Sequence, residues 1–402
     1  MLIVHKYGGT SVGSLERIEN VALRVAKAKK EGNDLVVVVS AMSGETNKLV
    51  GFAEHFSDKP SKREMDMLLS SGERVTSALL AIALKEMGVD AIAMTGRQAG
   101  IKTDDSHTYA RIDSIDPTAM QNEIAKGKVV IVAGFQGISE SGDITTLGRG
   151  GSDLSAVAIA GALDADACEI YSDVDGIYTT DPRIEPKAKK MDFISYDEML
   201  ELASLGAKVL QNRSVELAKK LNVKIVAKSS FSDAEGTVIG KESKEMEAVL
   251  VSGIALDRNQ ARVTIREVSD RPGIAAEIFT KLAEEQINVD MIIQNASPDH
   301  STTNLGFTVP QNEISRARDV IESFDHDIGS MDFDDSVCKV SVVGVGMKSH
   351  AGVAATAFRA LANENINIEM ISTSEIKVSM IIAEKYAELA VRTLHSVYEL
   401  DK

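Results

Sequence analysis

The sequence predicts an α/β protein in which a large domain with a mainly parallel sheet is followed by two small α+β units. Three observations predict this fold class: a strand, a glycine loop, a helix and a strand follow one another at the N-terminus, later strands are continuously apolar, and an internal repeat occupies the C-terminal part. Because 402 residues exceed the usual size of one compact domain, we expect two or three separate cores.

The N-terminal segment has the order of a βαβ unit. The apolar run "LIV" predicts a short buried strand, and the segment "KYGGTSVGS" predicts a tight loop. An amphipathic helix follows, with Ser14 as its N-cap and Gly32 as its stop. Its apolar residues recur at three- and four-residue spacing, at Ile18, Val21, Ala22 and Val25. The run "DLVVVV" then predicts the second strand.

Continuous apolar strands indicate a sheet that is buried on both faces. The runs "LVVVV" and "KVVIVAGF" lack the alternation of apolar and polar residues that a half-exposed strand shows. Such strands are typical of parallel sheets with helices on both sides. We therefore predict one α/β domain over residues 1–245, with helices on both faces of its sheet.

An internal repeat marks the C-terminal part. Residues 273–292, "GIAAEIFTKLAEEQINVDMI", align without a gap with residues 352–371, "GVAATAFRALANENINIEMI", and eleven of the twenty positions are identical. Each copy has the order strand, helix, strand, strand, helix. We assign the first copy to residues 261–335 and the second to residues 336–402.

The second copy lacks one strand. The first copy can end with a strand near "GSMDFDDS", whereas the second reaches Lys402 just after its last helix. The connecting segment 246–260 contains "AVLVSGIAL", which has the β character of a strand. We predict that this segment pairs with the second copy and completes it.

Composition excludes several classes of partner. With 44 Lys and Arg against 60 Asp and Glu, the net charge is −16, opposite in sign to a nucleic-acid-binding surface. Cys168 and Cys338 lie far apart and outside any CxxC or Cys/His cluster, so neither a disulfide framework nor a zinc site is expected. No segment approaches the roughly 18 to 20 apolar residues that span a bilayer. We expect a soluble, cytoplasmic protein that binds neither nucleic acid nor membrane.

The first glycine-rich loop can hold an anion. Glycines let backbone N–H groups approach phosphate oxygens, and the helix that follows adds partial positive charge. Lys6 ends the first strand and directs a cation toward the mouth of the sheet, where ligands of such folds bind. Glycines that merely need positive φ are the alternative. No GxxxxGK[ST] loop and no suitable GxGxxG motif is present, which disfavours Walker-type and Rossmann sites.

A second glycine-rich stretch, "TTLGRGGSD", precedes an alanine-rich helix. Arg149 offers a fork that matches a carboxylate or phosphate, and the flanking glycines admit a ligand close to the backbone. Asp153 can order a nearby cation. Taken alone, the stretch favours a turn that carries an exposed ion pair.

Six motifs occur in order along the chain: "KYGGTSV", "VVVSAMSGETNKL", "SGERVTSALLA", "TTLGRGGSD", "YSDVDGIYTTDPR" and "GAKVL". With them the chain resembles the aspartate kinase family, in particular its single-function members with two C-terminal ACT domains. The resemblance covers essentially the whole chain and implies an amino-acid-kinase-like three-layer domain followed by two ACT domains. Tyr7 and Gln211-Asn212 depart from residues that are frequent in the family.

The resemblance implies transfer of the γ-phosphoryl group of ATP to the side-chain carboxylate of L-aspartate, the first step toward lysine, threonine and methionine. The implied catalytic residues are Lys6 and Asp153. Arg149 would bind the α-carboxylate and Glu73 the α-ammonium, within a substrate site of Ser40, Thr46, Glu73, Arg149, Gly150, Gly151 and Ser152. The implied ATP-binding residues are Lys6, Gly8, Gly9, Thr10, Ser11, Ser172, Asp173, Tyr178, Arg183 and Lys208. Singly, Glu73 could be a solvated helix residue and Thr46 a helix cap.

The chemistry needs no general base, because aspartate is already ionised at neutral pH. The sequence offers no dedicated metal cage, so we expect Mg²⁺ to arrive with ATP and assign it no protein ligands.

The ACT resemblance further implies feedback regulation by lysine, threonine or both, and a homo-oligomer that associates through these domains. Candidate effector-binding residues in the first copy are Asp270, Gly273, Gln294 and Asn295. Those in the second copy are Met347, Ser372, Thr373, Ser374 and Glu375. Helix capping and strand-edge hydrogen bonding are the alternative roles for these residues.

Two other functions stay open at this point. One is a related kinase that phosphorylates glutamate, N-acetylglutamate, carbamate or a nucleotide monophosphate. The other is a catalytically silent amino-acid sensor, in which Lys6 and Asp153 would be dispensable. Glu73, Arg149 and the tandem repeats together favour aspartate.

Overall fold

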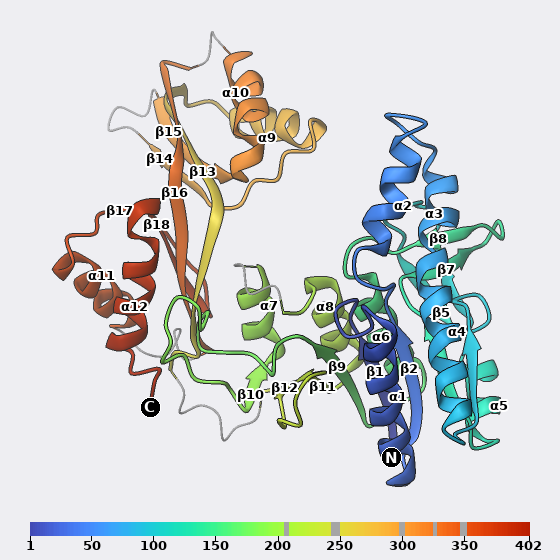
Figure 1. Ribbon diagram of the computed structural model, residues 1–402. Helices are drawn as coiled ribbons and strands as arrows, with labels where there is room; N and C mark the ends of the chain where they lie inside the picture. The colour runs from blue at the N-terminus through green and yellow to red at the C-terminus, as the bar shows by residue number, and fades with distance from the viewer. Residues whose placement is uncertain (205–208, 243–249, 297–301, 325–327, 346–351) are drawn as a thin grey trace. The chain divides into compact units, whose positions relative to one another are not determined.

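The computed structural model describes residues 1–204, 209–242, 250–296, 302–324, 328–345 and 352–402 (Figure 1). These residues form two compact units. The first comprises Met1–Ile177, Lys190–Ala203 and Lys208–Ser243, and the second comprises Tyr178–Lys189, Ser204–Ala207 and Lys244–Lys402.

The first unit is built on an eight-stranded sheet with the order β10-β12-β11-β9-β1-β2-β6-β3. Every pair in it is parallel except β11 with β12, so the predicted mainly parallel sheet is confirmed. The strands are β1 (Leu2–Tyr7), β2 (Asp34–Val39), β3 (Ala91–Met94), β6 (Val129–Ala133), β9 (Ala167–Ser172), β10 (Phe193–Ser195), β11 (Ile225–Ser229) and β12 (Thr237–Gly240).

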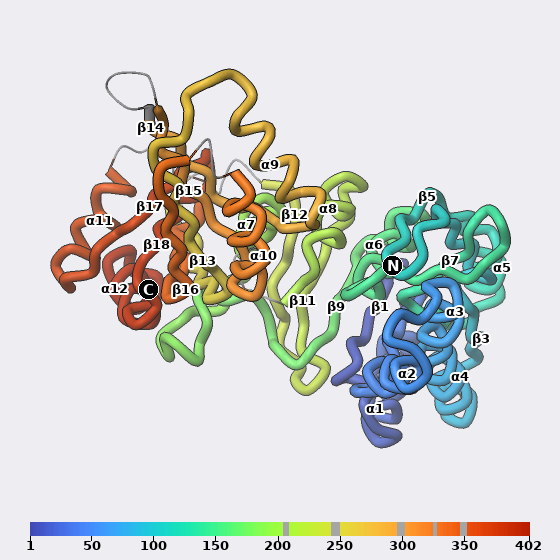
Figure 2. The backbone as a smooth tube through the Cα atoms, turned by 90° about the horizontal axis from the view of Figure 1, so that it is seen from above, coloured from blue at the N-terminus to red at the C-terminus, as the bar shows by residue number. Residues whose placement is uncertain are grey.

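Helices cover both faces of this sheet. On one face α1 (Leu15–Lys30) lies beside α4 (Ser71–Glu86), and both pack on alternate residues of the central strands (Figures 1 and 2). On the other face α6 (Gly151–Ala162) packs against β1, β2 and β9, with α8 (Asn212–Leu221) beside it. The predicted cap of α1 is confirmed, because the Ser14 side chain accepts from the Arg17 N–H at 3.3 Å.

A second, four-stranded sheet of the first unit was not anticipated. Its order is β5-β4-β7-β8. The strands are β4 (Ile101–Thr103), β5 (Ile112–Ile115), β7 (Gln136–Ser139) and β8 (Ile144–Thr146). The remaining helices of the unit are α2 (Glu45–Glu54), α3 (Lys62–Leu69), α5 (Thr118–Ile124) and α7 (Tyr196–Ser204).

One helical stretch, Lys62–Glu86, is long and apolar enough by length and composition to cross a membrane. The expectation that no segment approaches this length was therefore wrong. The stretch consists of α3 and α4, and its apolar window is 50% buried. Leu80 and Leu84 are fully buried in the core beneath the sheet, which is where a core helix of a globular domain places its apolar residues.

The second unit is built on a six-stranded antiparallel sheet with the order β14-β15-β13-β16-β18-β17. Its strands are β13 (Gly253–Ser269), β14 (Ile292–Ala296), β15 (Thr302–Val309), β16 (Ser330–Val343), β17 (Ile368–Thr373) and β18 (Lys377–Ala383). Its helices are α9 (Ile274–Glu284), α10 (Ile314–Glu322), α11 (Val353–Asn363) and α12 (Ala387–Val397). Figure 2 shows α11 and α12 side by side.

Each repeat copy has its own core, and two long strands join the copies. Phe307 is buried with α9 and α10, whereas Met380 is buried with α11 and α12. Gly253–Asp257 pairs with the second-copy end of β16, and β13 then continues into the first copy. The sequence predicts separate strands here, but β13 and β16 each run through both copies, and the pairing between them shifts register between Asp257 and Arg262.

Candidate active site

The proposed catalytic pair lies at the carboxyl end of the parallel sheet. Lys6 is on β1 and faces α6, whose first turn carries Asp153. The Lys6 Nζ lies 2.5 Å from the Asp153 Oδ1, and each residue is only 8% exposed. The structure therefore brings the two predicted catalytic residues together as a nearly buried ion pair.

The glycine loop that follows β1 leaves room and donors beside Lys6. A Cβ atom on Gly8 would lie 3.4 Å from the Lys6 Nζ, so a glycine keeps the space next to the ammonium free. The Gly8 N–H donates to the Tyr171 carbonyl at 3.1 Å, which fixes the loop to β9. Within the described part of the chain, no hydrogen bond takes up the backbone N–H groups of Gly9 and Thr10. These two donors can point at a phosphate.

The Glu73 side chain is buried, and only one of its two carboxylate oxygens has a hydrogen-bond partner among the described residues. It lies in the first turn of α4 and is 3% exposed. Its Oε1 accepts from the Ala41 N–H at 3.1 Å, whereas its Oε2 has no hydrogen-bond partner among the described residues. Burial raises the pKa of Glu73 to about 7, against smaller lowering effects of backbone hydrogen bonds and Arg74. The solvated-helix alternative for Glu73 is wrong.

The loop after β2 lies directly against Glu73. A Cβ atom on Gly72 would lie 2.7 Å from the Ala41 Cβ, so glycine at this position permits the close approach. Ser40 is held at the end of β2 by its N–H, which donates to the Tyr7 carbonyl at 3.1 Å. Thr46 is the second residue of α2, whose N-cap is Gly44, so the cap alternative for Thr46 is wrong.

The stretch that carries Arg149 forms a turn into α6. Gly150 is the N-cap, with φ of 73°, and a Cβ atom there would lie 2.6 Å from the Gln211 Cγ. The Gln211 Nε2 donates to the Arg149 carbonyl at 2.8 Å and clamps the turn. The Arg149 side chain is exposed and has no ion-pair partner within the described ranges, so the alternative of an exposed ion pair finds no support there.

Gly151 and Ser152 begin α6 and are buried beside β6. A Cβ atom on Gly134 would lie 3.0 Å from the Ser152 Cβ, so the first turn of α6 packs directly against the end of β6. This packing places the helix N-terminus at the same sheet edge as the Lys6–Asp153 pair.

The predicted ATP-binding residues fall into three groups. Ser11 and Ser172 share a partner, because Ser230 accepts from the Ser11 hydroxyl at 2.8 Å and donates to the Ser172 carbonyl at 2.9 Å. Asp173 is exposed next to them. Tyr178 and Arg183 belong to the second unit, and Lys208 lies outside the described residues.

The segment that carries Tyr178 and Arg183 is attached to the second ACT copy. The Ile254 N–H donates to the Thr179 carbonyl at 2.7 Å, and the Thr179 hydroxyl lies 2.9 Å from the His395 Nε2. Arg183 is paired with Asp181 at 2.7 Å. The assignment of Tyr178 and Arg183 to ATP remains a prediction.

The candidate effector-binding residues lie near opposite edges of the six-stranded sheet. Gln294 and Asn295 are on β14, and the Asp270–Gly273 loop precedes α9. Ser372 and Thr373 end β17, and Ser374 and Glu375 follow them. Met347 lies outside the described residues. The effector roles of all nine remain predictions.

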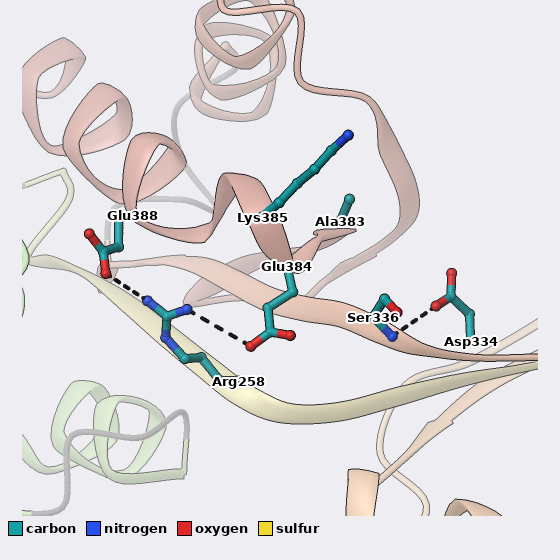
Figure 3. Close-up of a pocket in the computed structure, with 7 residues that line it drawn as sticks. All are labelled: Arg258, Asp334, Ser336, Ala383, Glu384, Lys385 and Glu388. Carbon is teal, nitrogen blue, oxygen red and sulfur yellow. Dashed lines mark hydrogen bonds and ion pairs between the residues drawn. The ribbon is translucent and has the colours of Figure 1, made fainter.

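The second unit also contains a charged pocket of about 620 Å³ (Figure 3). Its charges are largely paired with one another, since Arg258 lies 3.0 Å from Glu388 and 3.9 Å from Glu384. None of the predicted site residues lines it. In the residues that the structure describes, no group of three or more His, Cys, Asp and Glu side chains could hold a metal ion.

Sequence reasoning missed several residues that support the site. Asp66, Gln211 and Arg213 all bond to the segments around Arg149. Their partners are 62 to 80 residues away in the chain, so no local pattern indicates the contacts. Only the departure at Gln211 from the family's frequent residue drew attention to this region.

Comparison with known proteins decides the family. The Amino acid kinase family model matches residues 1–228, and an ACT domain model matches residues 266–323 and 340–398. The Aspartokinase of Helicobacter pylori is 59% identical over 100% of both chains. The chain belongs to the aspartokinase family.

Solved aspartokinases share the fold. The structure of Escherichia coli aspartokinase III in complex with aspartate and ADP, the R-state, matches with a TM-score of 0.81 and 27% identity, over 99% of both chains. The same enzyme in complex with lysine and aspartate, the T-state, matches with a TM-score of 0.79 and 27% identity, over 98% of this chain and 99% of that one. The chain is thus an ATP-dependent aspartate kinase with regulatory ACT domains, as the sequence predicts.

Proposed function

We propose that the first unit binds L-aspartate through Glu73 and Arg149 and transfers the γ-phosphoryl group of ATP to its side-chain carboxylate. The observation that carries these roles is the buried Glu73 Oε2, which has no partner among the described residues. A buried carboxylate oxygen without a partner is costly, and an α-ammonium supplies the missing charge and donors. Arg149 offers the complementary fork for the α-carboxylate.

The reaction follows from the charges at the site. A side-chain carboxylate oxygen of aspartate attacks the γ-phosphorus, and the bond from that phosphorus to the bridging oxygen of ADP breaks. The products are 4-phospho-L-aspartate and ADP, and no proton has to be removed from the nucleophile. Lys6 stabilises the negative charge of the transferring group, and Asp153 holds the Lys6 ammonium in place.

ATP enters as its magnesium complex, with the metal held by phosphates and water. The unused N–H groups of Gly9 and Thr10 bind phosphate oxygens, with Gly8 and Ser11 completing the loop. Ser172 and Asp173 flank the nucleotide in this proposal, and the assignment of Tyr178, Arg183 and Lys208 to ATP stays a prediction from the family resemblance. Ser40, Thr46, Gly150, Gly151 and Ser152 line the aspartate pocket.

Lysine, threonine or both regulate the enzyme through the ACT copies. Supporting this proposal, a related aspartokinase has been solved with lysine bound in a T-state. The candidate residues on β14 and β17 lie on the outer strands of the sheet, where a second copy of the chain can add its own strands. We therefore propose a cytoplasmic homo-oligomer that assembles through the ACT units.

The deciding experiment measures ADP formation by the purified protein with MgATP and either L-aspartate or L-glutamate. We expect turnover with aspartate only, and its suppression by lysine, threonine or the pair. Turnover without suppression would refute the effector proposal alone. A folded protein that binds ATP but shows no aspartate-dependent turnover would contradict the catalytic proposal.

A further inference from the structure

A buried carboxylate outside the proposed site links two of its parts. Asp66 lies on α3 and is 0% exposed. The Ser70 N–H donates to the Asp66 carbonyl at 3.0 Å, and α4 begins at the next residue. A displacement of Asp66 therefore displaces the first turn of α4, which carries Glu73.

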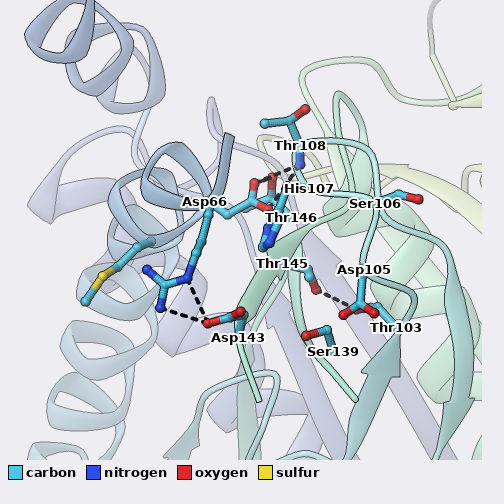
Figure 4. A network of polar contacts seen from close by, with 12 residues as sticks. Asp66, Thr103, Asp105, Ser106, His107, Thr108, Ser139, Asp143, Thr145 and Thr146 are labelled. Carbon is cyan, nitrogen blue, oxygen red and sulfur yellow. Dashed lines mark hydrogen bonds and ion pairs between the residues drawn. The ribbon is translucent and has the colours of Figure 1, made fainter. Parts of the chain in front are cut away.

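Three polar groups from two other segments contact the Asp66 carboxylate (Figure 4). His107 Nδ1 lies 2.7 Å from it, and the Thr108 N–H donates to both of its oxygens at 3.0 Å. The Thr146 hydroxyl donates to Oδ1 at 2.5 Å. The two carboxylate oxygens accept from the Thr108 N–H and the Thr146 hydroxyl at once and also lie against His107, so this one side chain joins both segments.

The contact with Thr146 fixes the start of the Arg149 turn. Thr146 is the last residue of β8 and precedes Arg149 by three positions. Between them, the Leu147 carbonyl accepts from the Arg213 Nη1 at 2.7 Å. The hydroxyl of Thr146 thus anchors the upstream end of a turn whose downstream end is held by Gln211.

The contact with Thr108 supports the same turn from its side. Thr108 has φ of 71°, which is unfavourable for a β-branched residue and needs stabilisation by its surroundings. The next residue, Tyr109, lies against the turn, because a Cβ atom on Gly148 would lie 2.6 Å from the Tyr109 Cδ2. The Asp66 carboxylate therefore holds both the strand that leads to Arg149 and the loop that packs beside it.

We propose that Asp66 is a positioning residue for aspartate recognition. It sets the spacing between the first turn of α4, which carries Glu73, and the Gly148–Arg149 turn. The proposal rests on the proposed roles of Glu73 and Arg149. None of the Asp66 side-chain contacts involves Lys6 or the glycine loop, so aspartate binding should respond to a change at Asp66 while ATP binding should not.

The test measures KM for aspartate and for ATP in single variants. Asp66→Asn removes the charge and turns an NH₂ toward existing donors, so we expect the aspartate KM to rise about tenfold or more and the ATP KM to stay within about twofold. Thr146→Val keeps the volume but loses the hydroxyl, and should raise the aspartate KM about three- to tenfold. Thr146→Ser keeps the hydroxyl and should stay near the wild-type value.

The matched control is a partly exposed ion pair that joins α3 to Asp143, the residue just before the other end of β8. The Arg63 Nη2 lies 2.8 Å from the Asp143 Oδ1, and the two side chains are 54% and 30% exposed. Asp143→Asn should leave both KM values within about twofold, because exposed pairs contribute little. A rise as large as that of Asp66→Asn would overturn the proposal.

Three further results would overturn it: an unchanged aspartate KM in folded Asp66→Asn, a parallel rise of both KM values, or equal values for Thr146→Val and Thr146→Ser. If Asp66→Asn does not fold, the comparison of Thr146→Val with Thr146→Ser decides.

The variant Arg149→Ala tests the substrate-site assignment separately from the positioning role of Asp66. An unchanged aspartate KM in Arg149→Ala refutes the substrate-site assignment and the proposal with it. A raised value there with an unchanged Asp66→Asn refutes the positioning role alone.

Discussion

The phosphoryl-transfer end and the amino-acid end of the proposed site treat charge in opposite ways. At the first, Lys6 and Asp153 neutralise each other as a nearly buried pair at 2.5 Å. At the second, one oxygen of the buried Glu73 carboxylate has no partner among the described residues, and the Arg149 side chain has no ion-pair partner among them. At one end the two charges already face each other, whereas at the other end we propose that the substrate supplies the opposite charges.

This difference between the two ends shows how one site can combine catalysis with selection of the amino-acid substrate. Removing one member of a buried ion pair leaves an uncompensated charge, so a change at Lys6 or Asp153 should be costly even before ligand binds. An unpaired buried carboxylate instead disfavours the empty site, and only a ligand with a matching ammonium relieves that cost. A dicarboxylate without an amino group cannot do so.

The largest effect, on kcat, should come from breaking the Lys6–Asp153 pair. Lys6→Met removes the cation that meets the transferring phosphoryl group and leaves Asp153 unpaired, so kcat should fall by about a thousandfold or more. Steady-state ADP formation measures it, with a thermal melt to confirm folding. Lys29→Met is the control, because Lys29 forms an exposed pair with Asp34 at 3.0 Å. A kcat within tenfold of the wild type would contradict the role of Lys6.

Removing the charge of Glu73 should weaken aspartate binding rather than lower turnover. Glu73→Gln keeps the shape but offers the ammonium no charge, so the aspartate KM should rise about a hundredfold while the ATP KM changes little. Glu45→Gln, on neighbouring α2, should leave the aspartate KM unchanged because the ion pair that Glu45 makes among the described residues is with Lys48. Equal rises of both KM values in Glu73→Gln would show a general disturbance of the fold.

The same substitution should stabilise the ligand-free protein in alkaline solution. A raised pKa means that ionisation of Glu73 opposes folding, so its favourable contribution is complete at low pH and is lost as pH rises through about 7. We expect Glu73→Gln to unfold with a free energy on the order of 1 to 3 kcal/mol higher at pH 8.5, and less than about 1 kcal/mol higher at pH 5. Urea unfolding at the two pH values measures this. A difference that does not grow with pH would refute it.

The smallest of these effects is the pH dependence of the wild-type enzyme. In the proposed site, aspartate binding needs the ionised form of Glu73, and burial raises the pKa of Glu73 to about 7. Between pH 8 and pH 6 the aspartate KM should therefore rise about tenfold. The residual binding of Glu73→Gln should be flat over this range, which separates the titration of Glu73 from that of ATP. A flat wild-type profile would mean that Glu73 stays ionised in the free enzyme.

The sequence alone predicts the parts of this comparison that local patterns encode. The βαβ order, the cap at Ser14, the duplicated C-terminal units and the parallel sheet were all readable from periodicity and glycine positions. The assignment of Lys6, Glu73, Arg149 and Asp153 came from resemblance, and the structure shows that Lys6 meets Asp153.

Long-range contacts could not be predicted. Asp66 meets residues 41 to 80 positions away, in the loop between β4 and β5 and at the end of β8, and the three- and four-residue strands of that sheet carry too little pattern to be recognised. The burial of Glu73 also escaped prediction, because a carboxylate in the first turn of a helix is ordinarily exposed. Tyr178 and Arg183 belong to the second unit although their motif follows β9 directly.

The long strands β13 and β16 determine which segment of the chain can be transferred between proteins as a regulatory unit. Residues 253–257 of β13 pair with residues 339–343 of β16, so the second copy borrows a strand that precedes the first copy in the chain. A recombination event that moved either copy alone would leave an uncovered strand edge prone to self-association. The transferable module is the tandem together with its leading strand, and gene fusions that exchange sensors between enzymes should break upstream of Gly253 rather than between the repeats.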